Sequence, residues 1–330
     1  MKQRLLYVLV NYPTLSQTYK DSEIGALHSD FEIEILTIGQ SQAKYRQHYP
    51  FSAPQNQGEF ETSIKRFKPD IVHGHYLHTA DRLFAVSQIA DCPFTLRTHS
   101  FDVLGPTPEQ IKHYVKFLNT DRCLGILVFP FLANTLERLG VHHSKIVTDW
   151  PVVDLKRFHD ESPNGKAIIN TGACIPKKNM ASFLELASRC PSRDFRLYPI
   201  GYLTSQIESL NVSKGNPVKI FPTVEPYEMP SVYKQCEWLI YTANPQVPTI
   251  GWPMAVAEAQ ASGCGVLMQK VRPDLDEYVG PGGYTFTTLD EALDILNRPY
   301  PETMRTSGFK WAEKSDIRKN IHRLTDLWTS

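Results

Sequence analysis

The sequence has no excess of charge of either sign. Its 330 residues include 35 lysines and arginines and 35 aspartates and glutamates, so the formal net charge at pH 7 is zero. Proteins that bind nucleic acid usually carry a strongly basic surface, because lysine and arginine neutralise the phosphate backbone. The balanced charge therefore gives no reason to expect a nucleic acid partner.

Long apolar runs are also missing. No stretch approaches the roughly 18 apolar residues that a membrane-spanning helix requires. The run 5–10 follows a basic start, but it is too short for a secretory signal and no small-residue cleavage site comes after it. We therefore expect a cytoplasmic protein in which any membrane contact is peripheral, at the inner face. The basic stretch 65–68 could touch anionic lipid, although a solvated helix face is the more ordinary interpretation.

Closely spaced cysteine pairs are absent as well. This distribution is typical of reduced, buried thiols in a cytosolic protein and provides no disulfide framework. Low-complexity segments and short-period repeats are missing too, and the length is that of two ordinary domains. The six cysteines are scattered, and none lies in a C-x-x-C pair: Cys92, Cys123, Cys174, Cys190, Cys236 and Cys264.

What the sequence does contain is a regular alternation of short apolar segments with amphipathic ones. In the first half the expected strands are 5–10, 32–38, 71–73, 94–98, 125–129 and 145–148, and the expected helices are 17–28, 58–67, 79–89, 108–118 and 132–139. After a polar, turn-rich break, further strands are expected at 167–171, 196–200, 218–221, 238–241 and 265–268. Strands that alternate with helices predict parallel sheets covered on both faces.

We therefore predict an α/β protein with two doubly wound, Rossmann-like parallel-sheet domains that face a central cleft. The break at 160–165 is the expected linker, so the predicted domains are 1–159 and 160–305. The tail 306–330 is charged with spaced apolar residues and should form helices that pack back towards the N-terminal domain.

Ligands of doubly wound sheets bind outside the carboxyl ends of the strands. Polar residues that follow the expected strands are therefore candidates for a site. His75 follows one expected strand, His99 and Asp102 follow the next, and Lys177 and Lys178 follow the first strand of the second half.

The segment G-W-P-M-A-V-A-E-A-Q-A-S-G at 251–263 combines a turn with a short helix. Gly251 permits a sharp turn, and Pro253 suits the first position of a helix. The N–H groups of Met254 and Ala255 would then face an anion such as a phosphate. Glu258 lies about one and a half turns into the helix, where a carboxylate can accept hydrogen bonds from a sugar diol. A short surface helix is the simpler alternative.

Six short segments, spread along the whole chain, carry a resemblance. They are N-Y-P-T-L-S-Q-T with E-I (11–18, 23–24), P-D-I-V-H-G-H (69–75), P-F-T-L-R-T-H-S-F-D-V (93–103), V-D-L-K-R-F (153–158), T-G-A-C-I-P-K-K-N (171–179) and I-G-W-P-M-A-V-A-E-A (250–259). In this order and spacing they resemble the motifs of the family 4 glycosyltransferases of the GT-B fold.

The resemblance implies a retaining, metal-independent glycosyltransferase without a cofactor. It would transfer a hexose or related sugar from a nucleoside-diphosphate sugar to a glycan or lipid-linked acceptor, in polysaccharide or glycoconjugate synthesis. The N-terminal domain would hold the acceptor and the C-terminal domain the donor. Lys178 would contact the diphosphate, Glu258 the donor ribose, and His99 the donor sugar. The remaining candidate donor- or substrate-binding residues are Ser16, His75, Asp102, Lys177, Gly251, Trp252, Met254, Ala255 and Arg272.

Two positions depart from the family pattern. Ile250 stands where the family has the first Glu of its carboxylate pair, and Ala173 stands where it has an arginine. Each lost charge-assisted hydrogen bond would cost roughly 1.5–3 kcal/mol. Either Lys177 or Arg272 supplies the missing positive charge, or the donor is an unusual one. The departures also leave room for a non-catalytic binding subunit that has kept the GT-B scaffold, or for a GT-B sugar epimerase.

Three other patterns could indicate metal or dinucleotide chemistry. D-L-D at 274–276 has the D-x-D form of a metal site, but it follows a proline in an apparent surface turn. His73, His75 and His78 have metal-ligand spacing, but no cysteine, aspartate or supporting pattern accompanies them, so we expect these imidazoles to line the cleft. G-P-G-G at 280–283 lacks the strand-turn-helix context of a dinucleotide fingerprint and predicts a loop.

Overall fold

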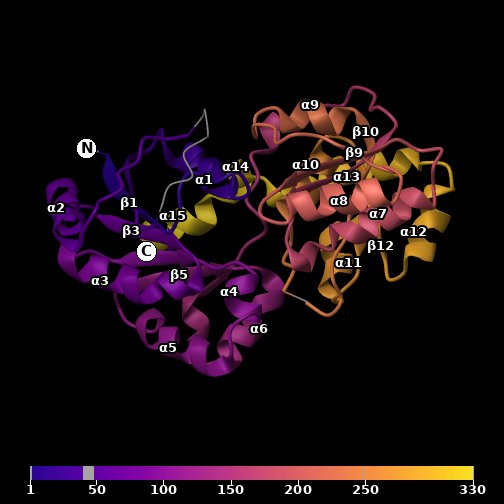
Figure 1. Cartoon of the computed structure of the whole chain (residues 1–330). Helices are drawn as coiled ribbons and strands as arrows, with labels where there is room; N and C mark the ends of the chain where they lie inside the picture. Colours follow the sequence, from indigo (N-terminus) through magenta and orange to yellow (C-terminus); the bar gives the residue numbers. More distant parts are fainter. Residues whose placement is uncertain (1, 40–47, 248, 330) are drawn as a thin grey trace. The chain divides into compact units, whose positions relative to one another are not determined.

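The chain folds into two units, which we describe separately (Figure 1). The computed structural model describes residues 2–39, 48–247 and 249–329. One unit comprises Met1–Trp150 with Ile317–Ser330, and the other comprises Pro151–Asp316. Each contains a six-stranded sheet in which every strand pair is parallel. The predicted α/β class with two parallel sheets is confirmed.

In the first unit the strand order is β2-β1-β3-β4-β5-β6. The order reverses at β1 and β3, so this pair forms the switch point of the sheet. The strands are β1 (Gln3–Leu9), β2 (Phe31–Thr37), β3 (Ile71–His75), β4 (Phe94–Arg97), β5 (Cys123–Val128) and β6 (Ile146–Thr148). The helices are α1 (Tyr19–Leu27), α2 (Gln57–Phe67), α3 (Ala80–Ala90), α4 (Phe101–Leu104), α5 (Pro108–Leu118), α6 (Pro130–Arg138), α14 (Ile317–Asn320) and α15 (His322–Thr329).

Alternation along β1 supplies both core layers of this unit. Leu6 and Val8 join the layer that also contains buried residues of α2, α3, α5 and α6. Tyr7 and its neighbours in the alternate positions join the layer formed with α1 and α15. The C-terminal helix completes this second layer, because Trp328 is buried and its Nε1–H donates to Thr95 Oγ1 at 3.1 Å.

The second unit has the strand order β12-β11-β10-β7-β8-β9. Its switch point is the pair β7 and β10. The strands are β7 (Ala167–Ala173), β8 (Phe195–Ile200), β9 (Lys219–Ile220), β10 (Cys236–Tyr241), β11 (Gly265–Gln269) and β12 (Gly283–Phe286). The helices are α7 (Met180–Ser188), α8 (Thr204–Ser213), α9 (Met229–Lys234), α10 (Met254–Ala261), α11 (Asp274–Val279), α12 (Leu289–Leu296) and α13 (Glu302–Ala312).

The edge strand β12 is missing from the sequence prediction, which places only a loop at 280–283. The structure has a short 3-10 turn at Gly280–Gly282, and the strand begins at Gly283. A four-residue strand that begins in a Gly-Pro-Gly-Gly run has almost no local signal of its own. Its pairing with β11 along Val266 to Gln269 is what places it in the sheet.

The division between the units differs from the predicted boundaries at 159/160 and 305/306. The chain passes into the second unit after Trp150 and leaves it after Asp316. Helix α13 stays with the second unit because Trp311 Nε1–H donates to the Tyr278 carbonyl at 3.0 Å. The expected linker 160–165 is also packed, since Asn164 Nδ2 donates to the Cys236 carbonyl at 2.9 Å.

Candidate functional site

In the second unit the predicted residues gather at the switch point of the sheet. Lys177 and Lys178 follow β7, and the loop 242–253 follows β10. Two hydrogen bonds join these exits: Thr242 Oγ1 donates to the Lys178 carbonyl at 2.8 Å, and the Asn244 N–H donates to the Lys177 carbonyl at 2.9 Å. The Lys177 Nζ donates to the Thr249 carbonyl at 3.5 Å. The carboxyl ends of two neighbouring strands thus form one linked surface.

Lys178 is a partly exposed cation at this surface. A Cβ atom on Gly172 would lie 2.5 Å from Nζ, so this glycine, at φ +109°, leaves the space that the ammonium group occupies. Nζ lies 5.1 Å from the centre of the Tyr241 ring, and within the described part of the chain it makes no hydrogen bond or ion pair. Burial, followed by the charge of Lys177, lowers the pKa of Lys178 to about 8, against a smaller opposing effect of Glu258. An anionic ligand would relieve this unneutralised charge.

Glu258 lies in the second turn of α10 and is partly exposed. Its Oε2 accepts a hydrogen bond of 3.0 Å from the Tyr233 hydroxyl. Burial raises the pKa of the Glu258 carboxyl, and the Tyr233 bond and the charges of Arg157 and Lys178 oppose that effect. The carboxylate is therefore oriented by a neighbour and is still accessible to a hydroxyl donor.

The start of α10 differs in one detail from the prediction. Pro253 is the N-cap residue, with φ −73° and ψ 133°, and the helix begins at Met254. The N–H groups of Met254 and Ala255 still belong to the first turn, where a helix has no acceptors of its own to offer them. Gly251 and these first-turn residues are partly exposed. The predicted turn before a helix N-terminus is therefore present next to Glu258.

Arg272 is held by two other groups, which weakens its candidacy as a diphosphate ligand. Its Nε donates to Asp274 Oδ1 at 2.9 Å, and its Nη1 donates to the Ile250 carbonyl. Trp252 is 3% exposed, stacks on Tyr278 at 4.9 Å, and donates from Nε1 to Asp274 Oδ2 at 2.9 Å. Arg272 and Trp252 therefore brace the loop that carries the site, and Ile250 is buried beneath it at 1% exposure.

The D-x-D segment also has local partners. Asp274 binds Arg272, and Asp276 forms an ion pair with Lys270 at 2.5 Å and accepts from Thr285 Oγ1 at 2.5 Å. These contacts explain both carboxylates as structural groups at the start of α11.

In the first unit His99 follows β4 and is surrounded by aromatic rings. Ring centroids of Tyr19, Tyr76 and His75 lie 4.4, 4.7 and 5.4 Å from that of His99. The His99 backbone N–H donates to Asp102 Oδ1 at 2.8 Å, and the second Asp102 oxygen accepts from the N–H of residue 77 at 2.6 Å. Asp102 thus ties the loop after β4 to the loop after β3.

His75 and Asp102, both predicted to contact a ligand, are 1% and 2% exposed. His73, expected to line the cleft with them, is 0% exposed. The prediction ended the strand at 73, but β3 continues to His75. Residues 73 and 75 therefore lie on one face of the strand, where Glu23 of α1 contacts both imidazoles. The two imidazoles act inside the unit and not at its surface.

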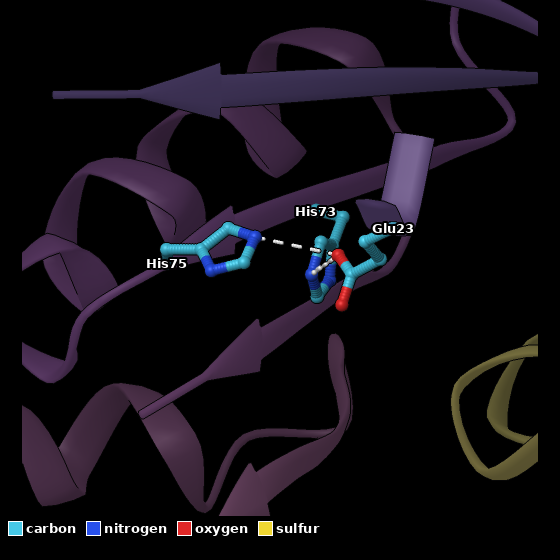
Figure 2. A group of neighbouring side chains, drawn as sticks. All are labelled: Glu23, His73 and His75. Carbon is cyan, nitrogen blue, oxygen red and sulfur yellow. Dashed lines mark ion pairs between the residues drawn. The ribbon is translucent and has the colours of Figure 1, made fainter. Parts of the chain in front are cut away.

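Glu23 of α1 meets both histidines (Figure 2). Its Oε1 lies 3.0 Å from His73 Nε2 and 3.3 Å from His75 Nε2, and it accepts from the Tyr7 hydroxyl at 3.0 Å. Its Oε2 accepts from Arg97 Nε at 2.7 Å. One ligand atom from each of Glu23, His73 and His75 lies within 4.8 Å of the others, a spacing that a metal ion could use. The carboxylate already accepts hydrogen bonds from the Tyr7 hydroxyl and the Arg97 guanidinium, and the two imidazoles contact it without a hydrogen bond.

Arg97 links this carboxylate to a second one. Its Nη1 donates to Asp149 Oδ2 at 2.9 Å, and Asp149 also lies 3.7 Å from the Arg323 guanidinium of α15. Glu23, Arg97 and Asp149 are buried at 0%, 4% and 1% exposure. No pattern in the sequence indicates these three residues as a group. The E-I of the opening segment was the one available signal for Glu23, and nothing local pairs it with residues so distant in sequence.

Ser16, the remaining candidate, lies exposed in the turn between β1 and α1. Four residues on, Lys20 is 1% exposed and donates from Nζ to the Asn11 carbonyl at 2.7 Å. Burial lowers the pKa of Lys20 to about 7. The turn therefore has an accessible hydroxyl at Ser16, and the buried Lys20 of α1 ties the start of that helix to the turn at Asn11.

No protein-family model matches the chain, and no curated protein matches it in sequence. Solved structures match it over nearly the full length of both chains. HepE from Anabaena, in complex with UDP and glucose, has a TM-score of 0.81 at 13% identity, covering 98% of this chain and 99% of that chain. Sucrose-phosphate synthase from Thermosynechococcus elongatus has a TM-score of 0.76 at 13% identity, covering 99% and 98%.

A third structure, the lipopolysaccharide outer core galactosyltransferase WaaB in its apo form, has a TM-score of 0.62 at 12% identity, covering 98% of this chain and 99% of that chain. At these identities the matches establish the architecture, and the chain has the GT-B fold. Among the described residues, no helix has both the length and the apolar character needed to cross a membrane.

Proposed function

We propose that this protein is a glycosyltransferase that takes a sugar from a nucleoside-diphosphate donor bound by its second unit. The observation that carries the proposal is that Lys178 and Glu258 lie close enough at the β7/β10 switch point for each to shift the pKa of the other, without forming an ion pair in the described residues. One is a desolvated cation with no ion pair in the described residues, and the other is an oriented carboxylate. A nucleoside diphosphate carries a negative diphosphate that suits Lys178 and a ribose diol that can donate hydrogen bonds to Glu258.

Each proposed role follows from the charge that moves during transfer. The leaving diphosphate becomes more negative as the glycosidic bond breaks, so Lys178 and the first turn of α10 would stabilise it where the charge develops. Glu258 would accept hydrogen bonds from the ribose hydroxyls. His99 of the first unit would act on the donor sugar. In a retaining reaction the departing phosphate would take the proton of an acceptor that attacks from the same side.

The donor proposal is supported by the fold and by the ligands bound to one neighbour, HepE. HepE has been crystallised with UDP and glucose and with UDP-glucose. We accordingly propose UDP as the first nucleotide to test. Retention, a hexosyl group, the absence of a metal and a glycan or lipid-linked acceptor are further parts of the proposal, and they rest on the sequence resemblance alone.

Calorimetric titration with UDP, ADP and GDP tests the site. Glu258→Ala should weaken binding of the preferred nucleotide by about ten- to a hundredfold, the worth of a charge-assisted hydrogen bond. Glu277→Ala is the matched control, because Glu277 is an exposed carboxylate on α11 of the same unit. Equal affinity in wild type and Glu258→Ala would remove Glu258 from the site.

A non-catalytic nucleotide-binding subunit is the second candidate, and the buried Ile250 favours it. The side chain of Ile250 has no carboxylate, whereas the family 4 glycosyltransferases that the sequence resembles have a glutamate at this position. Release of nucleotide from a panel of nucleotide sugars, with and without acceptors, separates the two functions. Turnover that His99→Ala abolishes supports transfer, and nucleotide binding without any turnover supports the subunit. Isomerisation of the sugar with no acceptor present would instead indicate an epimerase.

A further inference from the structure

A chain of contacts runs from the buried Glu23 to His99, the proposed sugar-acting residue. Oε1 of Glu23 lies 3.3 Å from His75 Nε2, and His75 Nδ1 lies 3.1 Å from His99 Nε2. Glu23 and His75 are 0% and 1% exposed, so water does not compete for these contacts. Within the described residues His75 Nε2 makes no hydrogen bond, so its contact with Glu23 is one of charge and proximity. His99 is thus connected through one imidazole to a single carboxylate.

The carboxylate at the start of this chain is ionised. Burial alone would raise the pKa of Glu23, but Arg97 and then His73 and His75 lower that pKa well below its usual range. An ionised carboxylate can only accept hydrogen bonds. The negative charge of Glu23, 3.3 Å from His75 Nε2, therefore favours the tautomer of His75 that carries its proton on Nε2.

The direction of the hydrogen bond between His75 and His99 follows from the position of the proton on His75. Burial lowers the pKa of His75 to about 4, so its ring is neutral at pH 7 and carries a single N–H. With that proton on Nε2, Nδ1 is an acceptor, and His99 must donate to it from its own Nε2. Burial also lowers the pKa of His99 well below its usual value, with His75 and Arg97 acting in the same direction. A neutral His99 with its proton on Nε2 has a bare Nδ1.

The rings around His99 hold it in this orientation. Tyr19 and Tyr76 lie against it, and their hydroxyls hydrogen-bond to each other. The planes of the His75 and His99 imidazoles lie within 18° of each other, with ring centroids 5.4 Å apart, which suits a hydrogen bond between ring nitrogens. A flipped His99 ring would point a carbon at His75 Nδ1 and leave that buried acceptor unsatisfied, at a cost of about 1–3 kcal/mol.

We propose that Glu23 and His75 are positioning residues that set His99 in its Nε2–H tautomer and so make its Nδ1 a hydrogen-bond acceptor for a hydroxyl of the donor sugar. The substrate specified in this way is a sugar with a free hydroxyl at the contacted carbon, because a deoxy or O-alkylated position has no proton to donate. The role in sugar recognition rests on the proposed function, whereas the tautomer itself does not.

Histidine 15N NMR of the whole chain, recorded without ligand, tests the tautomer. In the wild type His99 should be neutral with its proton on Nε2. In Glu23→Gln the side-chain amide can donate to His75, which would reverse both contacts and move the His99 proton to Nδ1. His75→Phe, which keeps the ring volume, should remove the constraint and give a mixture of tautomers.

His73→Phe is the matched control. It also takes an imidazole away from Glu23 Oε1, but His73 Nδ1 faces Thr95 Oγ1 at 2.8 Å and not His99. The His99 tautomer should stay as in the wild type. If the control shifts His99 as much as His75→Phe does, the cluster acts through general packing and the proposal is wrong. A His99 that is protonated on Nδ1 in the wild type also overturns it.

Donor turnover then tests the recognition step. His75→Phe should lower kcat by about tenfold, the worth of one hydrogen bond, with the affinity for the free nucleotide unchanged. A changed tautomer with an unchanged kcat would overturn the role in recognition. Wild-type protein that turns over no donor but shows the expected tautomer contradicts the proposed function and leaves the tautomer assignment standing. A stoichiometric metal that perturbs the His73 and His75 signals would overturn the assignment, because the ion would replace the proton on Nε2.

Discussion

The two units place charged residues at the carboxyl ends of their strands in opposite ways. In the first unit Glu23, Arg97 and Asp149 are buried, and Arg97 forms ion pairs with both carboxylates. In the second unit Lys178 and Glu258 are partly exposed, and Lys178 has no ion pair in the described residues. The charged residues near the strand ends therefore form a buried network in one unit and stay partly exposed in the other.

This difference teaches that a polar residue at a strand end is not by itself a ligand contact. A buried ion pair costs desolvation energy and needs every partner in place, so its members are committed to the fold. A half-exposed lysine with a lowered pKa has lost part of its hydration without gaining an opposite charge, and an anionic ligand can supply that charge. The comparison predicts that substitutions in the first unit change stability, whereas those in the second unit change binding.

The largest expected effect is on the stability of the first unit. Arg97→Met should destabilise it by about 3–5 kcal/mol, because Glu23 and Asp149 would remain buried without their cation. Scanning calorimetry measures the change. Arg66→Met is the control, since Arg66 pairs with Glu34 at 65% side-chain exposure, and it should cost at most about 1 kcal/mol. Equal losses of unfolding free energy from the two substitutions would show that the buried ion pairs of the first unit stabilise it no more than an exposed one does.

The next effect is on the pH dependence of nucleotide binding. The pKa of Lys178 is lowered to about 8, so its positive charge is present below that pH and is lost above it. The affinity for UDP should therefore fall as the pH rises through about 8. The Lys178→Met variant should bind UDP more weakly than the wild type, and its affinity should not change across this pH range. In the absence of ligand Lys178→Met should not destabilise the protein, because it removes a desolvated charge.

Calorimetric titrations on either side of pH 8 provide the measurement. Lys310→Met, which removes an exposed lysine of α13, should bind UDP like the wild type at every pH. A wild-type affinity that does not change across this range would show that Lys178 makes no charged contact with the diphosphate.

The smallest effect concerns the orientation of Glu258. Tyr233→Phe deletes the hydroxyl that donates to Oε2 and should weaken UDP binding by about two- to tenfold, the worth of one ordinary hydrogen bond. Tyr300→Phe is the control, because the Tyr300 hydroxyl donates to the Gly263 carbonyl at the other end of α10. Identical titrations for the two variants would mean that Glu258 needs no orienting partner.

Local sequence signals predicted the elements well where they were strong. Helix α5 has the predicted bounds, since Thr107 and Gln110 form a capping box around Pro108. Strand β12 and the true length of β3 were missed. A strand of four residues after a Gly-Pro-Gly turn has too few apolar positions to show a period. In β3 the polar residues at 73 and 75 hide a strand that is buried on both faces.

What the sequence determined by itself was the alternation of strands and helices, and with it the α/β class and the set of polar residues near strand ends. Periodicity and turn residues are properties of neighbours in the chain, so one sequence is sufficient to identify them. Which of those residues are buried was decided only by the tertiary structure. Glu23 meets Arg97 across 74 positions of sequence, and Arg97 meets Asp149 across 52. Contacts of that range leave no local pattern, because packing of α1 and β4 brings them together.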